Sequence, residues 1–369
     1  MSVTAGLRRL TASPGRAAMR SAVRLRTRSW PSWSRLFAVG ERVGWSVDED
    51  AEHVAAAAHR LGYAVGPAEW APFAGRQAVF LTSHFEALAP RWLSSPHRLG
   101  LAYMHGRPGT PGAPEFDRAF DALRANAARI ARVQVTHEEM EELVLSAGVE
   151  RSRVFRIPLG IDLGLFPLGD GEARSSTRQA LGLPRDAFVA GSFQKDGVGW
   201  AEGWEPKLVK GPDVLVAALA RLRELRPELH VLLTGPARGY VLRELQRLAI
   251  PCRHVLLRSR EELAHAYHAL DVYVVASRQE GGPKAVLEAM ASGAPIVSTR
   301  VGQAATLIQH GINGWLADVE DVEALVELAA GASPEPAIRA AARATAEELA
   351  LERLDRQWAA LFEGFVERD

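Results

Sequence analysis

Short runs of apolar, mostly β-branched residues recur along the chain, and longer stretches in which apolar residues repeat with helical spacing separate them. Strands that alternate with helices in this way build parallel sheets from βαβ units. The pattern therefore predicts an α/β protein. Its expected strands are residues 36–39, 78–81, 99–104, 133–136 and 154–157, followed by 187–192, 230–234, 255–257, 272–276 and 296–299.

A chain of 369 residues is about twice the usual domain size, so we expect two domains. Residues 158–176 are rich in Gly, Pro and small polar residues and show no periodicity, which is typical of a linker. Two βαβ domains leave a cleft beside the carboxyl ends of their strands, where open α/β sheets bind ligands. The predicted parts are a basic tail (1–34), an N-terminal domain (35–165), a linker (166–180), a C-terminal domain (181–345) and a C-terminal helix (346–369) that packs back toward the N-terminal domain.

The composition is that of an ordinary soluble protein, with 47% hydrophobic and 24% charged residues. The formal net charge is zero, which gives no general attraction to nucleic acid. Cys252 is the single cysteine, so the chain fits a reducing compartment. No apolar run approaches the roughly 18 residues that span a bilayer, and arginines interrupt the region where a signal peptide would be apolar. We therefore expect a cytoplasmic protein.

The first forty residues carry eight arginines and no acidic residue before Glu41. This tail has two interpretations. It is a disordered basic extension, or it is an interfacial segment that contacts an anionic membrane on the cytoplasmic face through residues 8–35. The second interpretation depends on Met19, Val23, Trp30 and Trp33, which lie among the arginines.

The stretch QEGGPKAVLEAMASG, residues 279–293, follows an expected strand that ends at Ser277. Pro283 suits the first position of a helix, and Gly293 suits its C-terminal stop. A strand, a glycine-rich turn and a helix N-terminus together form an anion site, because unpaired N–H groups and a partial positive charge of ~0.5 meet there. A phosphate is the ligand that this arrangement favours.

Two glutamates, Glu280 and Glu288, flank this helix start eight positions apart. One carboxylate could bind the hydroxyls of a sugar beyond a phosphate, and the other could bind those of a ribose on the opposite side. The alternative is structural: Glu280 would be a favourable first-turn acid and Glu288 a solvated helix residue.

Lysine is rare in this chain, where only four of 44 basic side chains are lysine. Three of the four, Lys195, Lys207 and Lys210, fall within residues 191–213, and the fourth is Lys284 in the glycine-rich turn. A compact ammonium on a flexible stem is a natural partner for a diphosphate. The glycines of residues 197–203 have the spacing GxGxxxG, which is weak evidence for a dinucleotide site, and we interpret them as a flexible loop.

The chain from about residue 80 to residue 327 resembles retaining GT-B glycosyltransferases of the group 1 type. The resemblance is specific in the second half, which is similar to the donor domain of that family, and loose in the first half. Glu280 and Glu288 match the E-x7-E motif of that family, and Lys210 with Gly211 matches its Lys-Gly element. The resemblance implies an α/β fold of GT-B type, with two Rossmann-like βαβ domains facing a central cleft. It also implies a nucleotide-diphosphate-sugar donor, linked to UDP, GDP, ADP or TDP, with no cofactor and no metal.

By this resemblance Glu280 would hold the donor sugar, Glu288 the ribose and Lys210 the diphosphate. The loop around Leu257 and Arg258 would hold the base, and His105 in YMHGRPG would lie beside the transferred sugar; alternatively, His105 caps a turn. The expected catalytic residues are His105, Lys210 and Glu280. The expected donor-binding residues are Ser192, Lys195, Lys210, Gly235, Arg258, Glu280, Gly281, Gly282, Pro283, Lys284 and Glu288.

Three positions depart from the family pattern. Ser192 stands where the family has an arginine, whose charge Lys195 would supply, and Thr306 stands where an acidic residue is expected. Pro283 replaces the third residue of the family's Gly-Phe-Gly and has no N–H for a phosphate. These changes bear on donor identity and on whether the activity is retained.

We therefore expect a retaining, metal-independent transferase that moves a hexose-like sugar to a saccharide, lipid-linked or small-molecule acceptor, in cell-envelope or exopolysaccharide synthesis. Two alternatives stay open: a sugar-nucleotide-binding protein without turnover, and a glycoside hydrolase that uses Glu280 and Glu288. The acids of residues 48–50 resemble a metal-binding DxD but suit a helix start, and His84 suits either the cleft or a packing role.

Overall fold

The computed structural model describes residues 36–42 and 46–367, which form two compact units. Within the described range, unit 1 comprises residues up to Tyr103, Arg118–Ile157 and the C-terminal segment from Leu354, and unit 2 comprises Met104–Asp117 and Pro158–Arg353. The basic tail and its proposed membrane segment, residues 8–35, lie outside the described residues.

Unit 1 is built on a five-stranded parallel sheet whose strands lie side by side in chain order. The five strands predicted for this part of the chain are confirmed, with ends that differ by up to three residues. The strands are β1 (Leu36–Val39), β2 (Ala78–Leu81), β3 (Arg98–Ala102), β4 (Ile130–Val135) and β5 (Val154–Arg156). The helices between them are α3 (Ser46–Arg60), η1 (Ala68–Phe73), α4 (His84–Ala87), α5 (Pro90–Leu93), α6 (Pro114–Asn126), η2 (Ala127–Arg129), α7 (Glu138–Ser146) and η3 (Arg151–Arg153).

Alternate residues of the unit 1 strands point to opposite faces of the sheet, as the pleat requires. Val79 and Leu81 enter the main core of the unit. Phe80 points the other way and meets Trp358 edge-on, with ring centroids 5.7 Å apart. Trp358 belongs to α16 (Asp355–Phe362), so the C-terminal segment covers the second face of this sheet.

Unit 2 is built on a six-stranded parallel sheet with the order β11-β10-β9-β6-β7-β8. Its strands are β6 (Phe188–Ser192), β7 (Leu229–Thr234), β8 (Cys252–Val255), β9 (Val272–Val275), β10 (Ile296–Thr299) and β11 (Trp315–Ala317). Four of the five predicted strands are confirmed. β8 starts three residues earlier than predicted and ends where the prediction began, and β11, only three residues long, was not predicted. The two Rossmann-like sheets confirm the predicted α/β class.

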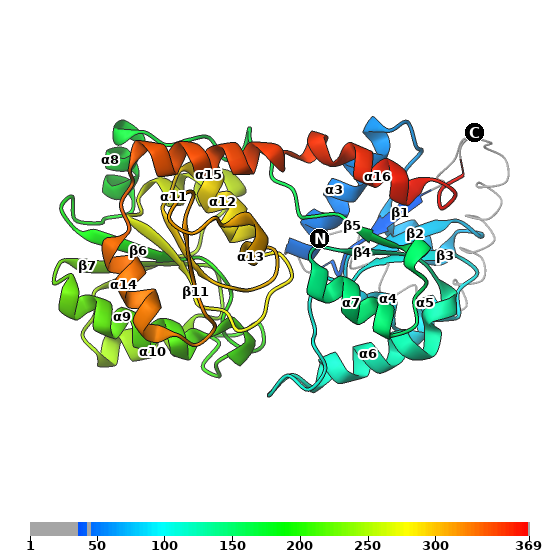
Figure 1. Cartoon of the computed structure of the whole chain (residues 1–369), viewed down its shortest axis with the longest axis horizontal. Coiled ribbons are helices and arrows are strands. Elements are labelled where there is room, and N and C mark those ends of the chain that lie inside the picture. The colour runs from blue at the N-terminus through cyan, green and yellow to red at the C-terminus, as the bar shows by residue number, and fades with distance from the viewer. Residues whose placement is uncertain (1–35, 43–45, 368–369) are drawn as a thin grey trace, which may run out of the picture. The chain divides into compact units, whose positions relative to one another are not determined.

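Both faces of the unit 2 sheet carry a core, because its strands are apolar at successive positions. Val189 and Tyr273 enter one core, and their neighbours Ala190 and Val274 enter the other. In Figure 1 helices α9 and α10 lie on one side of the strands and α11, α12 and α15 on the other. The helices are α8 (Gly171–Ala180), η4 (Leu208–Lys210), α9 (Pro212–Leu225), α10 (Gly239–Arg247), α11 (Arg260–His268), α12 (Lys284–Ser292), α13 (Ala304–Leu307), α14 (Val322–Gly331) and α15 (Pro336–Glu348).

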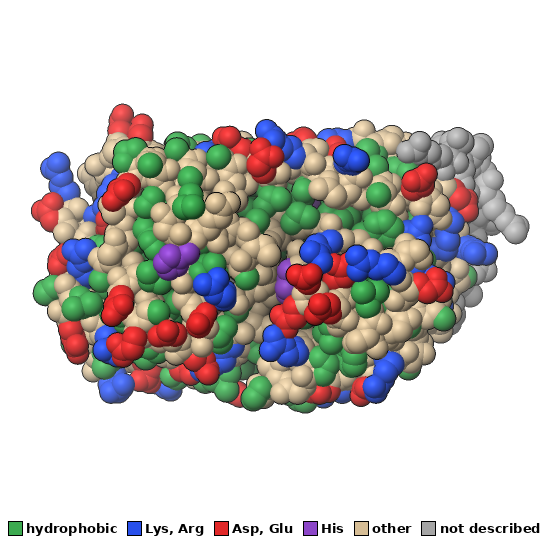
Figure 2. All heavy atoms as spheres, viewed as in Figure 1, with side chains coloured by type: hydrophobic (Ala, Val, Ile, Leu, Met, Phe, Trp, Pro, Cys, Tyr) green, Lys and Arg blue, Asp and Glu red, His purple; other side chains and the backbone are tan. Residues whose placement is uncertain are grey.

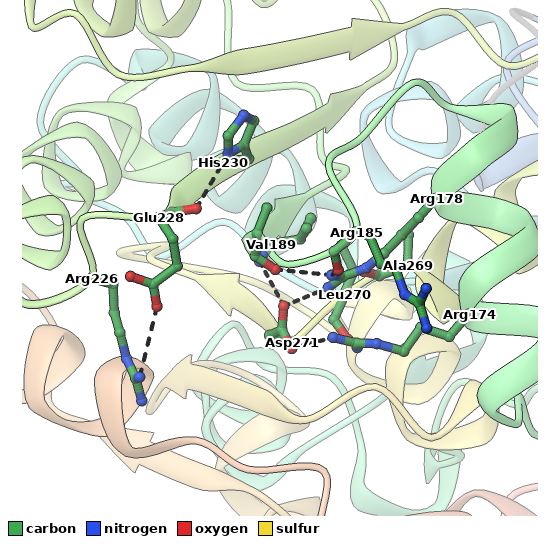
Figure 3. Close-up of polar contacts among 11 residues, drawn as sticks. Arg174, Arg178, Arg185, Val189, Arg226, Glu228, His230, Ala269, Leu270 and Asp271 are labelled. Atoms are coloured by element: carbon green, nitrogen blue, oxygen red, sulfur yellow. Dashed lines mark hydrogen bonds and ion pairs between the residues drawn. The ribbon is translucent and has the colours of Figure 1, made fainter.

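The predicted linker, residues 166–180, is part of unit 2, since its second half forms helix α8. Asp170 caps this helix by accepting a hydrogen bond of 2.8 Å from the N–H of Ala173. Figure 3 shows Arg174 and Arg178 reaching from α8 to Asp271. The N–O distances of the two ion pairs are 2.5 and 2.6 Å. These ion pairs attach α8 to the sheet. A segment without hydrophobic periodicity is therefore ordered by charged side chains.

The predicted C-terminal helix, residues 346–369, is interrupted. Helix α15 ends at Glu348, and η5 (Leu351–Leu354) precedes α16. The backbone of Ile161 donates a hydrogen bond to Leu349 O and accepts one from Leu351 N, at 3.0 and 3.2 Å. A backbone that pairs with a neighbouring extended segment cannot also continue the helical hydrogen-bond ladder, and the helix stops there.

Several surface features bear on the sequence predictions. None of the helices in the described ranges combines the length and apolar composition that crossing a bilayer requires. Figure 2 shows acidic and basic side chains interspersed on each unit, consistent with the balanced net charge.

Cys252, at the start of β8, is half-buried, and burial raises the pKa of its thiol to about 11.

Candidate nucleotide-sugar site

The order of the unit 2 strands marks a ligand site. The chain runs outward from β6 to β7 and β8, then returns to β9 and continues outward on the other side to β10 and β11. Ligands of open parallel sheets bind outside the carboxyl ends of the strands where the order reverses, here between β6 and β9. The strands described for unit 1 follow one another without a reversal. The argument from topology therefore applies to unit 2.

The turn after β9 brings the first predicted carboxylate to this point. Glu280 is 8% exposed, and its Oε1 accepts a hydrogen bond of 2.8 Å from the hydroxyl of Ser277. Lys210 Nζ donates to both carboxylate oxygens at 2.6 Å. An acid that only complemented a helix dipole would be solvated, so this pairing disfavours the structural alternative for Glu280.

Glu288 lies on the buried face of α12 and is 7% exposed. The Tyr267 hydroxyl donates a hydrogen bond of 2.7 Å to its Oε2. Burial and the nearby Glu288 charge raise the pKa of Tyr267 well above its ordinary value, so this hydroxyl stays a donor. The alternative of a solvated helix residue is wrong for Glu288. Tyr267 was missed at the sequence level, because nothing in the local pattern of α11 links it to a residue 21 positions away.

The lysine-rich segment follows β6. Lys195 Nζ donates to Gly197 O at 3.1 Å and lies 4.8 Å from the centre of the Trp200 ring. Burial and, next, repulsion from Lys210 lower the pKa of Lys195. Burial lowers the pKa of Lys207 as well, and repulsion from Lys210 and then from Lys195 lowers it further. Backbone hydrogen bonds of 2.8 Å, from Lys207 N to Asp196 O and from Lys210 N to Lys207 O, bring the segments of the three lysines together. Lys207 was recognised as a clustered lysine but not as a site residue.

Gly211 fixes the start of α9 against the end of β9. Its φ is +61°, and an added Cβ would overlap the carbonyl oxygen of Ala276. Only glycine combines this conformation with so close an approach of two backbones. Lys210 is therefore held next to Ser277 and Glu280 by the backbone on its C-terminal side.

The glycine-rich turn is closely packed against its own unit. An added Cβ at Gly281 would overlap Met104 O, and one at Gly302 would overlap Glu280 O. The segment that follows Met104 belongs to unit 2 and includes His105, whose ring meets Phe116 edge-on at 5.7 Å. The prediction had placed His105 in the N-terminal domain.

Helix α12 begins one residue later than predicted. Pro283 is its N-cap, with φ −65° and ψ 100°, and Lys284 is the first helical residue. A proline at the cap removes one N–H from the anion site, but the N–H groups of the first turn remain at this end of the helix. Gly293 ends the helix at φ +76°, as predicted.

The remaining predicted donor residues follow β7 and β8. Gly235 has φ +81°, and its carbonyl oxygen lies 2.7 Å from His254 Nε2. Arg258 is exposed, in the loop after β8, and its N–H donates to Glu262 at 2.7 Å. Since β7 and β8 are parallel to β6, both residues lie at the carboxyl edge of the sheet.

The departures from the family pattern have structural partners. Ser192 is 1% exposed, and its hydroxyl lies 3.3 Å from Arg238 Nη2. Thr306, in α13, donates to Gln303 O at 2.9 Å.

Two weaker candidates from the sequence lie in unit 1. Asp48 accepts a hydrogen bond from Arg42 N near the start of α3, and His84 packs between the rings of Phe85 and Tyr103.

Comparison with known proteins shows which family unit 2 of the chain is similar to. Residues 201–331 match the family model described as Glycosyl transferases group 1, and this range contains Lys210, Glu280 and Glu288. This match covers about a third of the chain and lies within unit 2. It is 36% identical over 228 residues to the D-inositol 3-phosphate glycosyltransferase of Xylanimonas cellulosilytica, covering 58% of the chain and 51% of the relative. It is 32% identical over 278 residues to D-inositol 3-phosphate glycosyltransferase 1 of Catenulispora acidiphila, covering 69% and 61%. The matches thus span about half to three-fifths of these relatives.

Solved structures place the chain in the GT-B fold class, the fold predicted from the resemblance. Anabaena Alr3699/HepE in complex with UDP-glucose superposes with a TM-score of 0.70 at 17% identity, covering 89% of this chain and 99% of that one. Sucrose-phosphate synthase from Thermosynechococcus elongatus superposes with a TM-score of 0.61 at 21% identity, covering 86% and 77%.

Proposed function

We propose that this chain is a glycosyltransferase that moves a hexose-like unit from a nucleotide-diphosphate sugar to an acceptor, with retention of configuration and without a metal. The observation that carries the proposal is the cluster of Lys195, Lys207 and Lys210 beside the buried carboxylate of Glu280, at the switch point of the unit 2 sheet. The match of residues 201–331 to the family model supports the transferase class. Structural neighbours solved in complex with UDP or UDP-glucose support a uridine nucleotide as the first donor to test.

The lysines would bind the diphosphate. An ammonium group has three donors, and Lys210 gives two of them to Glu280. A phosphate oxygen could therefore take the third donor while the ion pair stays intact. Lys195 and Lys207 would add charge on the same side, and each charge-assisted contact contributes about 1.5–3 kcal/mol.

The two glutamates would hold the ends of the donor. Glu280 would accept hydrogen bonds from the sugar hydroxyls, because it precedes the turn that Gly281 and Gly282 form. Glu288 would accept them from the ribose, with Tyr267 fixing the orientation of its carboxylate. His105 would lie beside the transferred sugar, and its place in the same unit as Glu280 supports that role.

Catalysis would be mainly electrostatic. Negative charge grows on the leaving diphosphate, and the lysines with the N-terminal end of α12 would stabilise it. A donor phosphate oxygen would take the acceptor proton, so the reaction would require no separate general base. The names of the curated relatives make D-inositol 3-phosphate the first acceptor to test.

A binding protein without turnover is the second candidate. Ser192, Pro283 and Thr306 favour it, since each replaces a group that the family pattern supplies. The glycoside hydrolase is less favoured, because Lys210 and Tyr267 hold the two carboxylates in separate ion-pair and hydrogen-bond arrangements.

The proposal is tested by thermal shift with UDP, GDP, ADP and TDP, followed by an acceptor screen with the corresponding nucleotide sugars. A ligand at 100 times its Kd stabilises the folded state by about 2.7 kcal/mol, so the true nucleotide raises Tm most. We expect stabilisation by one nucleotide and its release when donor and acceptor are present together. Stabilisation by none would reject the donor site. Binding without release in any acceptor screen would favour the binding protein, and sugar release with water alone the hydrolase.

A further inference from the structure

A fully buried ion pair lies beneath the lysine-bearing loop of unit 2. Arg238, the N-cap residue of α10, and Asp196, which follows β6, both have side chains that are 0% exposed. Arg238 Nη2 lies 3.0 Å from Asp196 Oδ2. Burial of two charges is costly unless they are paired and well coordinated, so the pair calls for an explanation.

The same guanidinium also holds the backbone of the loop. Arg238 Nη1 donates to Ser192 O at 2.7 Å and to Gln194 O at 2.6 Å. A third bond, to Thr234 O at 3.3 Å, links it to the end of β7. The planar, forked guanidinium can satisfy several acceptors at once, which a lysine cannot reproduce. One side chain therefore joins the carboxyl ends of β6 and β7 to the start of the loop.

The loop has a second attachment on α10. The N–H groups of Gly239 and Tyr240 donate to Glu202 O and Gly203 O at 2.7 and 2.9 Å. An added Cβ at Gly203 would overlap Ala237 O, so the loop lies directly on the helix N-terminus. Residues 197–203, interpreted from the sequence as a flexible loop, are therefore hydrogen-bonded to the first two residues of α10.

The buried pair and the lysines are connected through one residue. Asp196 pairs with Arg238 through its side chain, and its carbonyl oxygen accepts a hydrogen bond of 2.8 Å from Lys207 N. Lys195 is its chain neighbour. Because Arg238 is fully buried, it cannot contact a ligand itself, and any effect on binding must act through the loop.

We propose that Arg238 is a positioning residue: with Asp196 it holds residues 192–207 in the conformation that directs Lys195 and Lys207 to a diphosphate bound beside Lys210. This inference rests on the proposed function. It also gives Ser192 a role, since the small side chain leaves room for a guanidinium supplied from another element. The Arg238 guanidinium near Ser192 then holds the loop inside the protein, and the lysines bind the ligand.

Arg178 provides the matched control. It lies in the same unit, is 4% exposed and donates to Asp271 at 2.6 Å. Figure 3 shows this pair. Its contacts, however, are with Ala187 O and Ala269 O, near the amino ends of β6 and β9, and Asp271 accepts from Val189 N. Loss of Arg178 removes a buried arginine from the opposite end of the same strands.

The experiment compares Arg238→Lys, Arg238→Met and Arg178→Met with the wild-type chain. Hydrogen exchange without nucleotide is measured on peptides covering 193–207 and 171–180. Calorimetry then measures the affinity of each variant for a nucleoside diphosphate and for the matching nucleoside. The pairs are UDP and uridine, GDP and guanosine, ADP and adenosine, and TDP and thymidine. All titrations are run below the unfolding transition of each variant.

We expect both Arg238 variants to accelerate exchange in 193–207 and to weaken diphosphate binding by about tenfold, the loss of one charge-assisted contact, with nucleoside affinity unchanged. Arg178→Met should accelerate exchange in 171–180 and leave both affinities unchanged. Unaltered exchange in 193–207 would overturn the inference whatever the ligand, as would equal loss of diphosphate and nucleoside binding. If the wild type binds none of the four nucleotides, the proposed function itself fails. If Arg238→Met does not fold, Arg238→Lys decides the outcome.

Discussion

Lys210, the last residue of η4, and Glu280, in the turn after β9, form a two-pronged ion pair with Nζ 2.6 Å from each carboxylate oxygen. The pair is 70 residues apart in sequence but adjacent at the switch point of the sheet. It leaves one ammonium donor for a ligand while both carboxylate oxygens are held in a fixed orientation. Several testable consequences depend on this arrangement.

Removing Lys210 should affect stability and binding separately. Lys210→Met leaves the buried Glu280 carboxylate without its cation, and we expect unfolding in urea to become easier by about 1–3 kcal/mol. Adding Glu280→Gln should restore most of that stability, since the unpaired charge is gone. Nucleotide affinity should stay low in the double variant. Equal affinity of the wild type and the double variant would contradict the role of Lys210 as a diphosphate ligand.

The two glutamates should respond differently to truncation. Glu288→Ala should weaken nucleotide binding by about tenfold, while Glu280→Ala should reduce the transfer rate more than nucleotide affinity, because it acts on the sugar. Calorimetry and initial rates with the same donor separate the two effects. Glu327→Ala, an exposed position of α14, is the control. Negligible effects of both site substitutions would reject the assigned roles.

Gly211 should be intolerant of a side chain. Gly211→Ala places a Cβ against Ala276 O at φ +61°, and we expect a loss of about 3 kcal/mol or more. Gly182→Ala tests conformation alone, since its φ is +67° and no atom lies within 4 Å of an added Cβ; about 1 kcal/mol is expected there. Urea unfolding measures both. Similar losses at the two positions would show that the contact with Ala276 carries little energy.

Nucleotide affinity should depend on pH through the lysines. Burial and repulsion lower the pKa of Lys195 and Lys207 below the ordinary lysine value. Only the protonated ammonium attracts a diphosphate, so affinity should be constant below the lowered pKa and fall as the pH rises through it, before 10.5 is reached. Calorimetry between pH 7 and pH 10 tests this, and Lys195→Arg should make the decline smaller, because Lys207 alone of the two still titrates in this range. A flat profile in the wild type would contradict it.

Much of the fold was predictable because buried parallel strands are continuous apolar runs. Residues 36–39, 78–81 and 296–299 are strands with the bounds expected from that signal. The signal fails where a strand is short or polar: β11 has three residues, and β8 has a polar, partly exposed sequence. Helix α8 was missed for a related reason, since its position depends on ion pairs with Asp271, 93 residues from Arg178.

The candidate site was predictable to the extent that its residues are close in sequence. Glu280, Gly281 and Lys284 belong to one local motif, and the lysines to another. Tyr267 and Arg238 could not be found in that way, because their significance comes from partners that the fold brings close. A buried arginine in the turn PARG has no local signature that separates it from a surface arginine.

The half-buried thiol of Cys252 has a practical use. With a pKa of about 11 it carries little thiolate at neutral pH, so the described part of the chain offers almost no competing target for maleimide reagents. A cysteine introduced at the exposed Trp200 position would react first and selectively. A dye attached there would report movements of the lysine-bearing loop in real time, in a protein that needs no prior removal of its own sulfhydryl.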